Sequence, residues 1–331
     1  MSAVETAPRK SGWARRWSRW WLRSREARWG VGLTSIWLVG FLVFAAVPLG
    51  MSVYISFTNW APISGPFWDA HTIGLENYRT FLTDHVYWHS VFNTIYYAVG
   101  SVAVVNLVAL PMALLLNQKL RGLNIFRTIF YLPAILPAVA VVLVFRLILF
   151  PGTGLVSWVL TKVGAQCDTT QVTCNPVDWL NNPRLTMPAV ILVSAWGVGQ
   201  TLLIYLAGLQ GIDRGLYEAG AVDGTTSWSK FRYITLPLLT PAIFFNVVTG
   251  LIGAFQEFTK LVIFAGGATA TGGPRQSLLT TFWYVYVEGF DYFHMGLATA
   301  MAFGLFVLIL LFTGLNFLGQ KRWVFYQEER R

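Results

Sequence analysis

The sequence has few charged residues, and this scarcity argues against most soluble folds. Asp, Glu, Lys and Arg make up 12% of the 331 residues, whereas a typical soluble domain carries about a quarter. Hydrophobic residues make up 55%, which favours a lipid environment. The net charge of +9 comes from basic clusters beside apolar runs rather than from a basic face with interleaved aromatic residues. We therefore expect membrane lipid, and not nucleic acid, as a partner.

Motifs for catalysis and nucleotide binding are also missing. The chain contains no G-x-x-x-x-G-K-[ST] phosphate-binding loop, no H-E-x-x-H motif and no G-x-S-x-G motif. Only three ionisable residues fall within or near the apolar runs, namely Arg146, Glu257 and Lys260. A carrier driven by an ion gradient is expected to hold more acids at mid-membrane depth or to show an inverted repeat. The sequence predicts a transport pathway that is not an enzyme and binds no cofactor itself.

Long apolar runs predict six transmembrane helices. A spanning helix needs about 20 largely apolar residues, and such runs must be helical because lipid cannot pair the backbone polar groups. The fold class is therefore an all-α polytopic membrane protein. Six segments have the required length: 33–57, 91–116, 126–150, 186–210, 238–265 and 294–318.

The distribution of Lys and Arg predicts the orientation. Eight lie in residues 1–32, three in 117–127, three in 211–237 and four in 319–331, which together mark the cytoplasmic side. Both termini are therefore expected in the cytoplasm. The opposite side carries four, namely Arg79, Lys162, Arg184 and Arg275.

The two ends of the chain flank the predicted transmembrane domain, residues 33–320. The arm 1–32 contains GWARRWSRWWLRSREARW, which mixes Trp with Arg and predicts an interfacial helix. A disordered basic tail is the alternative for this arm. Residues 321–331 form a cytoplasmic tail.

One polar stretch stands out between the fourth and fifth predicted spans, EAGAVDGTTSWSKFRYITLP at 218–237. Glu218 lies near the start of a short predicted helix, where the helix dipole favours an acid, and Gly224 permits the turn that ends it. Such a helix, lying parallel to the membrane, would offer a projecting surface to which another protein can bind. An ordinary polar loop is the alternative.

The spacing of this stretch resembles the EAA loop of bacterial importer permeases of the ATP-binding-cassette (ABC) class. One position departs, because Gly220 stands where a small Ala is usual, and glycine lowers helix propensity by up to about 1 kcal/mol. The phrases SFTNW, GLENYRTFL, NTIYYAV, FRTIFYLPAILPAVAV, LAGLQGIDRGLYEA and TGGP are similar to the sugar-permease branch, of the maltose-transporter larger-subunit kind. The motif positions are Glu218, Ala219, Gly220, Asp223, Gly224, Ile234, Leu236 and Pro237.

This resemblance implies a permease subunit of an ATP-driven carbohydrate importer in the bacterial inner membrane. It implies that the loop couples to two separate ATP-binding-cassette subunits, which use ATP and Mg, and that a second permease completes the pathway. It also implies an extracytoplasmic sugar-binding protein that delivers the substrate. Two alternatives remain, namely an ion-coupled secondary sugar carrier acting alone and a membrane-embedded scaffold or enzyme subunit. The sugar itself stays open, and polyols and glycerol phosphate remain possible.

Small, aromatic and amide residues on two spans are the candidates for the substrate pathway, because sugars need stacking surfaces and hydrogen-bonding groups in a dry channel. The alternative for the glutamines is helix-to-helix hydrogen bonding, and the alternative for Glu257 is pairing with Lys260 near the outward end. The candidates are Trp196, Gly197 and Gln200 on the fourth span, and Gly253, Phe255, Gln256 and Glu257 on the fifth.

Few residues suit a metal site, and none is expected. His85 and His89 lie four residues apart beside Asp84 and could form a metal pair on one helical face. A wet interfacial stretch explains them as well. The two cysteines, Cys167 and Cys174, fall in one loop predicted to face outward, where the compartment is oxidising.

We predict a disulfide between Cys167 and Cys174, with two free thiols as the alternative. The bridge would close a loop of eight residues counting both ends, and the loop-entropy model gives about 2.5 kcal/mol of stabilisation. Mass mapping of non-reduced peptides is expected to find the two cysteine peptides linked. Two alkylatable thiols in freshly isolated membranes would contradict the prediction.

Overall fold

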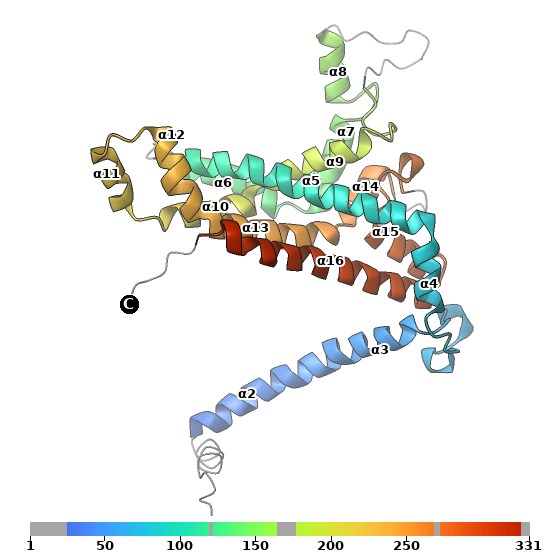
Figure 1. The fold of residues 1–331 in the computed structure, drawn as a ribbon. Coiled ribbons are helices and arrows are strands. Elements are labelled where there is room, and N and C mark those ends of the chain that lie inside the picture. The colour runs from blue at the N-terminus through green and yellow to red at the C-terminus, as the bar shows by residue number, and fades with distance from the viewer. Residues whose placement is uncertain (1–24, 119–121, 164–176, 268–271, 326–331) are drawn as a thin grey trace, which may run out of the picture. The chain divides into compact units, whose positions relative to one another are not determined.

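The computed structural model describes residues 25–118, 122–163, 177–267 and 272–325 of the chain. The chain divides into two compact units, residues 1–55 and residues 56–331, and each is described by itself. Apart from one isolated antiparallel bridge between Thr58 and Thr72, the described residues form helices and loops (Figure 1). The predicted all-α fold is confirmed.

The described residues of the first unit, from Arg25 on, form one continuous helical rod. It consists of α2 (Arg25–Phe41), the π-helical turn η1 (Leu42–Ala46) and α3 (Val47–Ser56). Residues Trp29–Ser56 are long and apolar enough to cross a bilayer, close to the predicted first span. Trp37 and Phe41, one turn apart, stack with ring centroids 5.6 Å apart.

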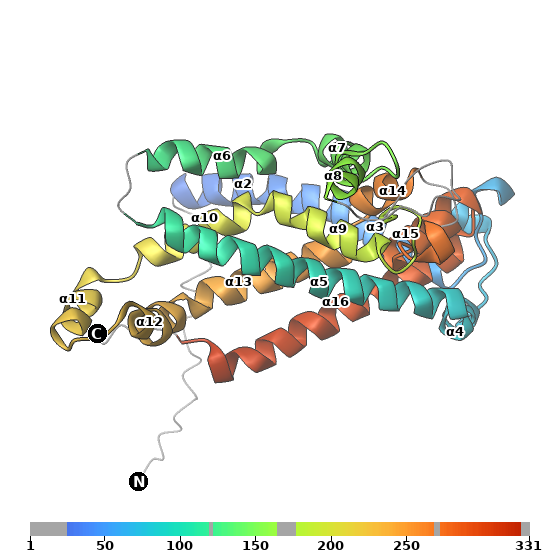
Figure 2. The ribbon, with the colours of Figure 1, turned by 90° about the horizontal axis from the view of Figure 1, so that it is seen from above.

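Three long helices form the frame of the second unit. These helices, α5 (His85–Leu116), α13 (Leu236–Phe255) and α16 (Met295–Trp323), run side by side (Figures 1 and 2). At one end of the frame lie α11 (Arg214–Val222) and α12 (Ser227–Lys230). At the other end lie α4 (Glu76–Thr83) and α15 (Thr281–Tyr286). Helices α11 and α12, which carry much of the polar stretch 218–237, therefore lie at the opposite end of the frame from α4 and α15.

The number of spans depends on how two bent helix pairs are counted. Four helices of the described residues are continuous and long enough to cross a membrane: Trp29–Ser56, His85–Leu116, Ser227–Phe255 and Met295–Trp323. Two further pairs meet the same test together but are bent, one by 96° and one by 50°. Counting each bent pair as one span gives up to six, the number that the sequence predicts.

One bend has an identifiable cause, and the other lies beside a glycine that allows close packing. The 96° bend separates α6 (Leu123–Ile135) from α7 (Ala138–Ile148), and Leu136 is extended there because Pro137 follows it. The 50° bend separates α9 (Thr186–Ser194) and the turn η4 (Ala195–Gly197) from α10 (Gly199–Gln210). A Cβ atom at Gly199 would lie 2.9 Å from the Phe130 carbonyl, so glycine lets α10 approach α6.

The fifth span differs from its prediction, 238–265, at both ends. The helix already begins at Ser227, because α12 continues through the π-helical turn η5 (Phe231–Thr235) into α13. Pro237 does not end this helix, since it lies in the first turn of α13, two residues after the last residue of η5, and the π-helical turn accommodates an irregular hydrogen-bond pattern. The span ends at Phe255, and α14 (Thr259–Ala265) is a separate short helix.

Short helices and turns complete the described residues. Among them, α8 follows α7, and four single turns lie in the loops that join the long helices. These elements are α8 (Leu155–Lys162), η2 (Pro62–Ser64), η3 (Phe67–Asp69), η6 (Pro274–Gln276) and η7 (Val287–Asp291).

Asp84 has a structural role at the end of the frame opposite α11. Its Oδ1 accepts a hydrogen bond from the Val86 backbone nitrogen at 2.8 Å and so caps α5. Its Oδ2 accepts from the Tyr284 hydroxyl at 2.7 Å. Burial, followed by the hydrogen bond to Asp84, raises the pKa of Tyr284, so this phenol stays a donor. Both carboxylate oxygens beside His85 are therefore occupied, one in capping α5 and the other in joining α5 to α15.

The loop that follows the first unit is fixed to α16 by close backbone contact. Asn77 donates to the carbonyls of Ser56 and Thr58 at 2.9 and 2.8 Å, and Gly296 donates its backbone N–H to the Trp60 carbonyl at 3.1 Å. A Cβ atom at Gly296 would lie 2.0 Å from the Thr58 carbonyl oxygen. Only glycine fits this position, because the Thr58 carbonyl belongs to the backbone and cannot move aside as a flexible side chain would.

Gly296→Ala is therefore expected to destabilise the protein. Gly314→Ala in the same helix is the matched control, since a Cβ atom there meets nothing within 4 Å. The control is expected to be neutral or to stabilise by up to about 1 kcal/mol, because alanine is the better helix former. The melting temperatures of the two purified variants check this, and equal shifts would contradict the close approach at Thr58.

Candidate functional site

Helix α11 is a well-capped element at the end of the frame. Its first turn is capped by Asp213, whose Oδ1 accepts from the Gly215 backbone nitrogen at 2.9 Å. At its other end Gly224 has φ +71°, and its N–H donates to the Ala221 carbonyl at 3.2 Å. The Thr225 N–H donates to the Gly220 carbonyl at 2.9 Å, which completes a Schellman motif. The glycine at 224 is required by this left-handed turn.

The unusual glycine at 220 is explained by close packing. Gly220 is buried, and a Cβ atom there would lie 3.0 Å from Thr225 Oγ1 and 3.4 Å from Ile234 Cδ1. The Tyr217 and Thr235 hydroxyls are 2.9 Å apart and join the same two elements. Glycine therefore brings α11 against η5, and the loss of helix propensity is offset by contacts that fix α11 to the fifth span.

Helices α11 and α12 and the turn η5, residues 214–235, form a helical hairpin that we call the α11 hairpin. Its outer surface is unusually apolar for a polar loop. Val222 is 89% exposed, Trp228 71% and Tyr233 76%, and Glu218 and Asp223 are exposed beside them. Exposed apolar groups rimmed by charge are typical of surfaces that bind another protein. Of the other predicted motif positions, Ala219 and Gly224 are exposed, whereas Ile234, Leu236 and Pro237 are partly buried beneath α11 or at the start of α13.

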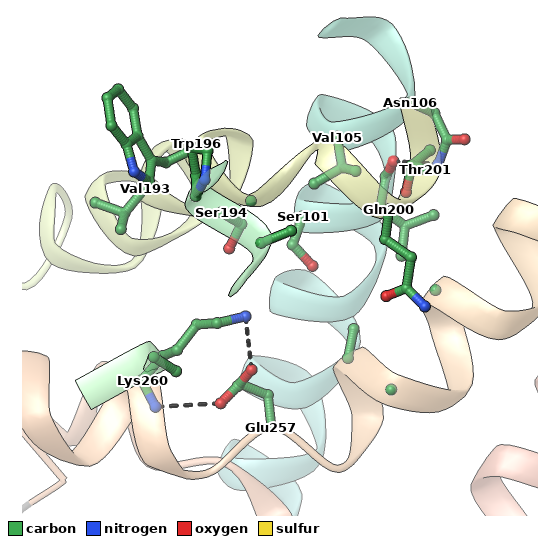
Figure 3. A pocket seen from close by; sticks show the side chains of 18 of the residues that line it. Ser101, Val105, Asn106, Val193, Ser194, Trp196, Gln200, Thr201, Glu257 and Lys260 are labelled. Carbon is green, nitrogen blue, oxygen red and sulfur yellow. Dashed lines mark hydrogen bonds and ion pairs between the residues drawn. The ribbon is translucent and has the colours of Figure 1, made fainter. Parts of the chain in front are cut away.

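A cavity of about 560 Å³ lies within the second unit (Figure 3). It is bordered by α5, by the bend between α6 and α7, by η4 and α10, and by α13 and α14. Its polar lining consists of hydroxyl and amide side chains and one acid–base pair. The polar residues are Tyr97, Ser101, Asn106, Ser194, Gln200, Thr201, Asn246, Thr249, Glu257 and Lys260.

Glu257 and Lys260 form an ion pair that faces this cavity, as the dashed lines in Figure 3 show. Lys260 Nζ lies 2.7 Å from Glu257 Oε2. The Lys260 backbone nitrogen donates to Glu257 Oε1 at 3.1 Å, so the carboxylate also caps the first turn of α14. The sequence-based alternative, a Glu257–Lys260 pair, is thus present, and the pair lines the cavity.

Five of the seven predicted pathway residues line the cavity: Trp196, Gly197, Gln200, Gly253 and Glu257. Trp196 is 51% exposed and packs edge to face on Phe145, with ring centroids 5.6 Å apart. The Gln200 side-chain amide has no hydrogen-bond partner within the described ranges, and it is exposed. This does not fit the alternative in which Gln200 joins two helices of this chain.

The other two predicted residues lie elsewhere. Phe255 is 1% exposed and contacts Phe312 of α16, with ring centroids 5.1 Å apart. Gln256 is exposed but does not line the cavity. For Phe255 the reason is helical geometry: each residue turns about 100° from the one before, so Phe255 falls on the face opposite to Gly253.

Sequence reasoning missed several lining residues. On α13, Asn246, Thr249 and Gly250 line the cavity together with the predicted Gly253, and these four follow the spacing i, i+3, i+4 and i+7. This stripe of polar and small residues in an apolar span was the signal that could have found them. Asn246 donates to the Thr201 carbonyl at 3.4 Å and so links α13 to α10.

Arg146, the third ionisable residue of the apolar runs, lies outside the cavity lining. Its guanidinium packs against Gly266, where a Cβ atom would lie 2.5 Å from Nη2. Gly266 is the C-terminal cap of α14, so the cation meets the end of a helix where the dipole favours positive charge. Cys167 and Cys174 lie outside the described residues.

Comparison with known proteins places this geometry in a family. A family model described as "Binding-protein-dependent transport system inner membrane component" matches residues 105–324. The probable ABC transporter permease protein YesP of Bacillus subtilis is 37% identical over 302 residues, covering 91% of this chain and 93% of that protein. The lactose transport system permease protein LacF of Rhizobium radiobacter is 34% identical over 247 residues, covering 74% and 78%.

A solved structure has the same fold. It is that of a bacterial ABC transporter "involved in the import of the acidic polysaccharide alginate", with a TM-score of 0.76, 22% identity, and coverage of 92% of this chain and 99% of that one. The predicted family is confirmed, and the chain is a transport subunit rather than an enzyme. This chain belongs to the family of multi-pass inner-membrane permeases of binding-protein-dependent ABC transport systems.

Proposed function

We propose that this permease forms one half of the pathway of a carbohydrate importer driven by a separate ATPase. The observation that carries the proposal is one uninterrupted helix, Ser227–Phe255, which joins the exposed hairpin at α11 to the cavity. Its first turns contact α11 through Ile234 and Thr235. Its last turns carry Gly250 and Gly253 on the cavity wall. A displacement of α11 is therefore transmitted along a rigid rod to the site of the ligand.

The cavity has the chemistry expected for a carbohydrate. Hydroxyl and amide groups supply donors and acceptors, and the half-exposed Trp196 supplies a flat surface for a sugar ring. Glycines at 197, 250 and 253 let a ligand approach the backbone. The name of the relative LacF, a lactose transport permease, supports this assignment.

The proposal includes the partners that complete the machine. A second permease would close the cavity, and an extracytoplasmic binding protein would deliver the saccharide. The α11 hairpin and both termini would lie in the cytoplasm. Two ATP-binding-cassette subunits, which use ATP and Mg, would bind the hairpin there. Closure of these subunits would move α11 and α13 as a rigid body and expose the cavity alternately to the two sides. An ion-coupled carrier acting alone would not need the exposed apolar surface of Val222, Trp228 and Tyr233.

Glu218→Lys is expected to abolish uptake while leaving membrane insertion normal. Glu218 is exposed and lies outside the apolar spans, so a lysine there disturbs neither folding nor insertion. A charge reversal at a docking surface costs several kcal/mol. The measurement is co-purification of the ATPase with the tagged permease, together with uptake of the ligand of the cognate binding protein.

Glu218→Gln is the matched control for this experiment. It keeps the size and the helix propensity of the side chain and introduces no repulsion. We expect the control to retain the ATPase and most of the uptake. Normal ATPase retention and uptake by Glu218→Lys would show that α11 is not the docking element.

Gln200→Ala is expected to weaken sugar binding, whereas Phe255→Ala is expected to lower the stability of the protein. Loss of the Gln200 amide leaves a sugar hydroxyl unpaired and costs about 1–3 kcal/mol of binding, so the concentration for half-maximal uptake rises by about 5- to 150-fold. Loss of the buried Phe255 ring instead leaves a cavity and lowers stability by about 3–5 kcal/mol.

Uptake normalised to complex abundance separates these two effects. Phe255→Ala should reduce yield and melting temperature, with the half-maximal concentration of the surviving complex unchanged. ATPase activity stimulated by the binding protein should persist in Gln200→Ala, because the α11 hairpin is untouched. An unchanged half-maximal concentration in Gln200→Ala would remove this residue from the pathway.

A further inference from the structure

Family membership leaves the charge of the ligand open. The relative LacF is named for lactose, which is uncharged, whereas the importer with the same fold is described as taking up an acidic polysaccharide. The charge preference must therefore come from the side chains that each member places in its own cavity. In this chain the residues that line the cavity are known, so the charge of its wall can be worked out.

The charges of this cavity cancel. Among the described lining residues, only Glu257 and Lys260 carry a formal charge at neutral pH. Lys260 Nζ and Glu257 Oε2 lie 2.7 Å apart, within direct ion-pair distance, and the two side chains are 32% and 17% exposed. The wall that this chain supplies is therefore neutral in sum.

An anionic ligand would meet two obstacles at this pair. The Lys260 ammonium, its natural partner, is already bound to Glu257. The Glu257 carboxylate would also stand beside the incoming anion, and like charges at a partly desolvated site repel strongly. A neutral saccharide meets neither obstacle, since its hydroxyls can donate to the carboxylate and accept from the ammonium without breaking the pair.

We propose that the half-pathway formed by this chain selects uncharged, hydroxyl-rich saccharides over saccharide acids, and that Glu257 sets this selection by neutralising Lys260. The inference rests on the proposed carbohydrate transport. It makes Glu257 a specificity residue rather than only a cap for α14. Without its charge, Lys260 becomes an unpaired cation facing the cavity and attracts an acid.

The two roles of Glu257 can be separated by substitution. Glu257→Gln removes the charge but keeps an oxygen that can accept from the Lys260 backbone nitrogen, so the cap is preserved. The double variant Glu257→Gln with Lys260→Met removes both charges and returns the wall to neutrality. If the ion pair only stabilises the fold, neither variant should change the ligand preference.

The test uses the complete membrane complex, with the second permease and the ATPase, in lipid nanodiscs. Saturation-transfer NMR compares matched ligands that differ only at C6, glucose against glucuronate and galactose against galacturonate, mixed in equal amounts. This readout suits weak binding and gives the acid-to-neutral ratio in one sample. Trp196→Ala identifies the part of the signal that comes from the cavity.

The wild-type complex is expected to favour the neutral sugar of each pair. Glu257→Gln should raise the acid-to-neutral ratio by about tenfold or more, since one unpaired charge a few ångströms from a ligand is worth at least that factor at an effective dielectric constant of about 20. The double variant should return to the wild-type ratio. A wild-type preference for the acid, or an unchanged ratio in a folded Glu257→Gln complex, overturns the inference.

The failure of the underlying function gives a different result. If no saccharide signal in the wild-type complex depends on Trp196, the cavity does not bind sugars and the proposed function itself fails. If sugars bind through Trp196 but the ratio ignores Glu257, only the inference on charge fails.

Discussion

The structure depends on one constraint, that a backbone polar group within lipid must be paired inside the protein. A spanning helix can therefore break only where a cavity or a neighbouring element supplies partners. The chain has three such breaks among its described residues, at Leu136–Pro137, at Ala195–Gly197 and at Gln256–Phe258. Each break borders the same cavity, through Leu136, Trp196 and Glu257 respectively. The irregular backbone and the candidate ligand site are consequences of the same arrangement, as in transporters whose discontinuous helices surround the substrate.

The fifth span, unlike these broken helices, is continuous as far as Phe255. From Ser227 to Phe255 the helix is uninterrupted, although it contains Pro237 and Pro241, and its irregularity is confined to the π-helical turn η5. The buried Gly220 lets α11 pack closely against this turn, since a Cβ atom there would lie 3.0 Å from Thr225 Oγ1 and 3.4 Å from Ile234 Cδ1. A stiff rod therefore connects the hairpin to the cavity, and flexibility is left to the breaks around the ligand. This division allows a force applied at α11 to change the cavity rather than to be absorbed along the way.

The sequence predicted the helices and the hairpin because both signals are local. Apolar length identifies a span regardless of its neighbours, and the EAA spacing is specific enough to identify the hairpin. The rotation of each span was not predictable in the same way, because a window of hydropathy has no angular information. Sequence alone therefore groups Phe255 with Gly253, although Phe255 lies on the opposite face of α13, against Phe312. The start of the fifth span was misplaced because Pro237 is normally a boundary signal, and only the three-dimensional structure shows the π-helical turn that accommodates it.

The Glu257–Lys260 pair joins these two themes. An ion pair taken out of water is usually costly, and it persists where further hydrogen bonds and some access to water support it. Both conditions hold here: the break after Phe255 leaves the first turn of α14 in need of an acceptor, and Glu257 Oε1 provides it. The pair also faces a cavity instead of lipid, so water and ligand hydroxyls can solvate it. The same break that opens the helix thus makes a charged residue tolerable at this depth, and the charge then decides which ligands the wall accepts.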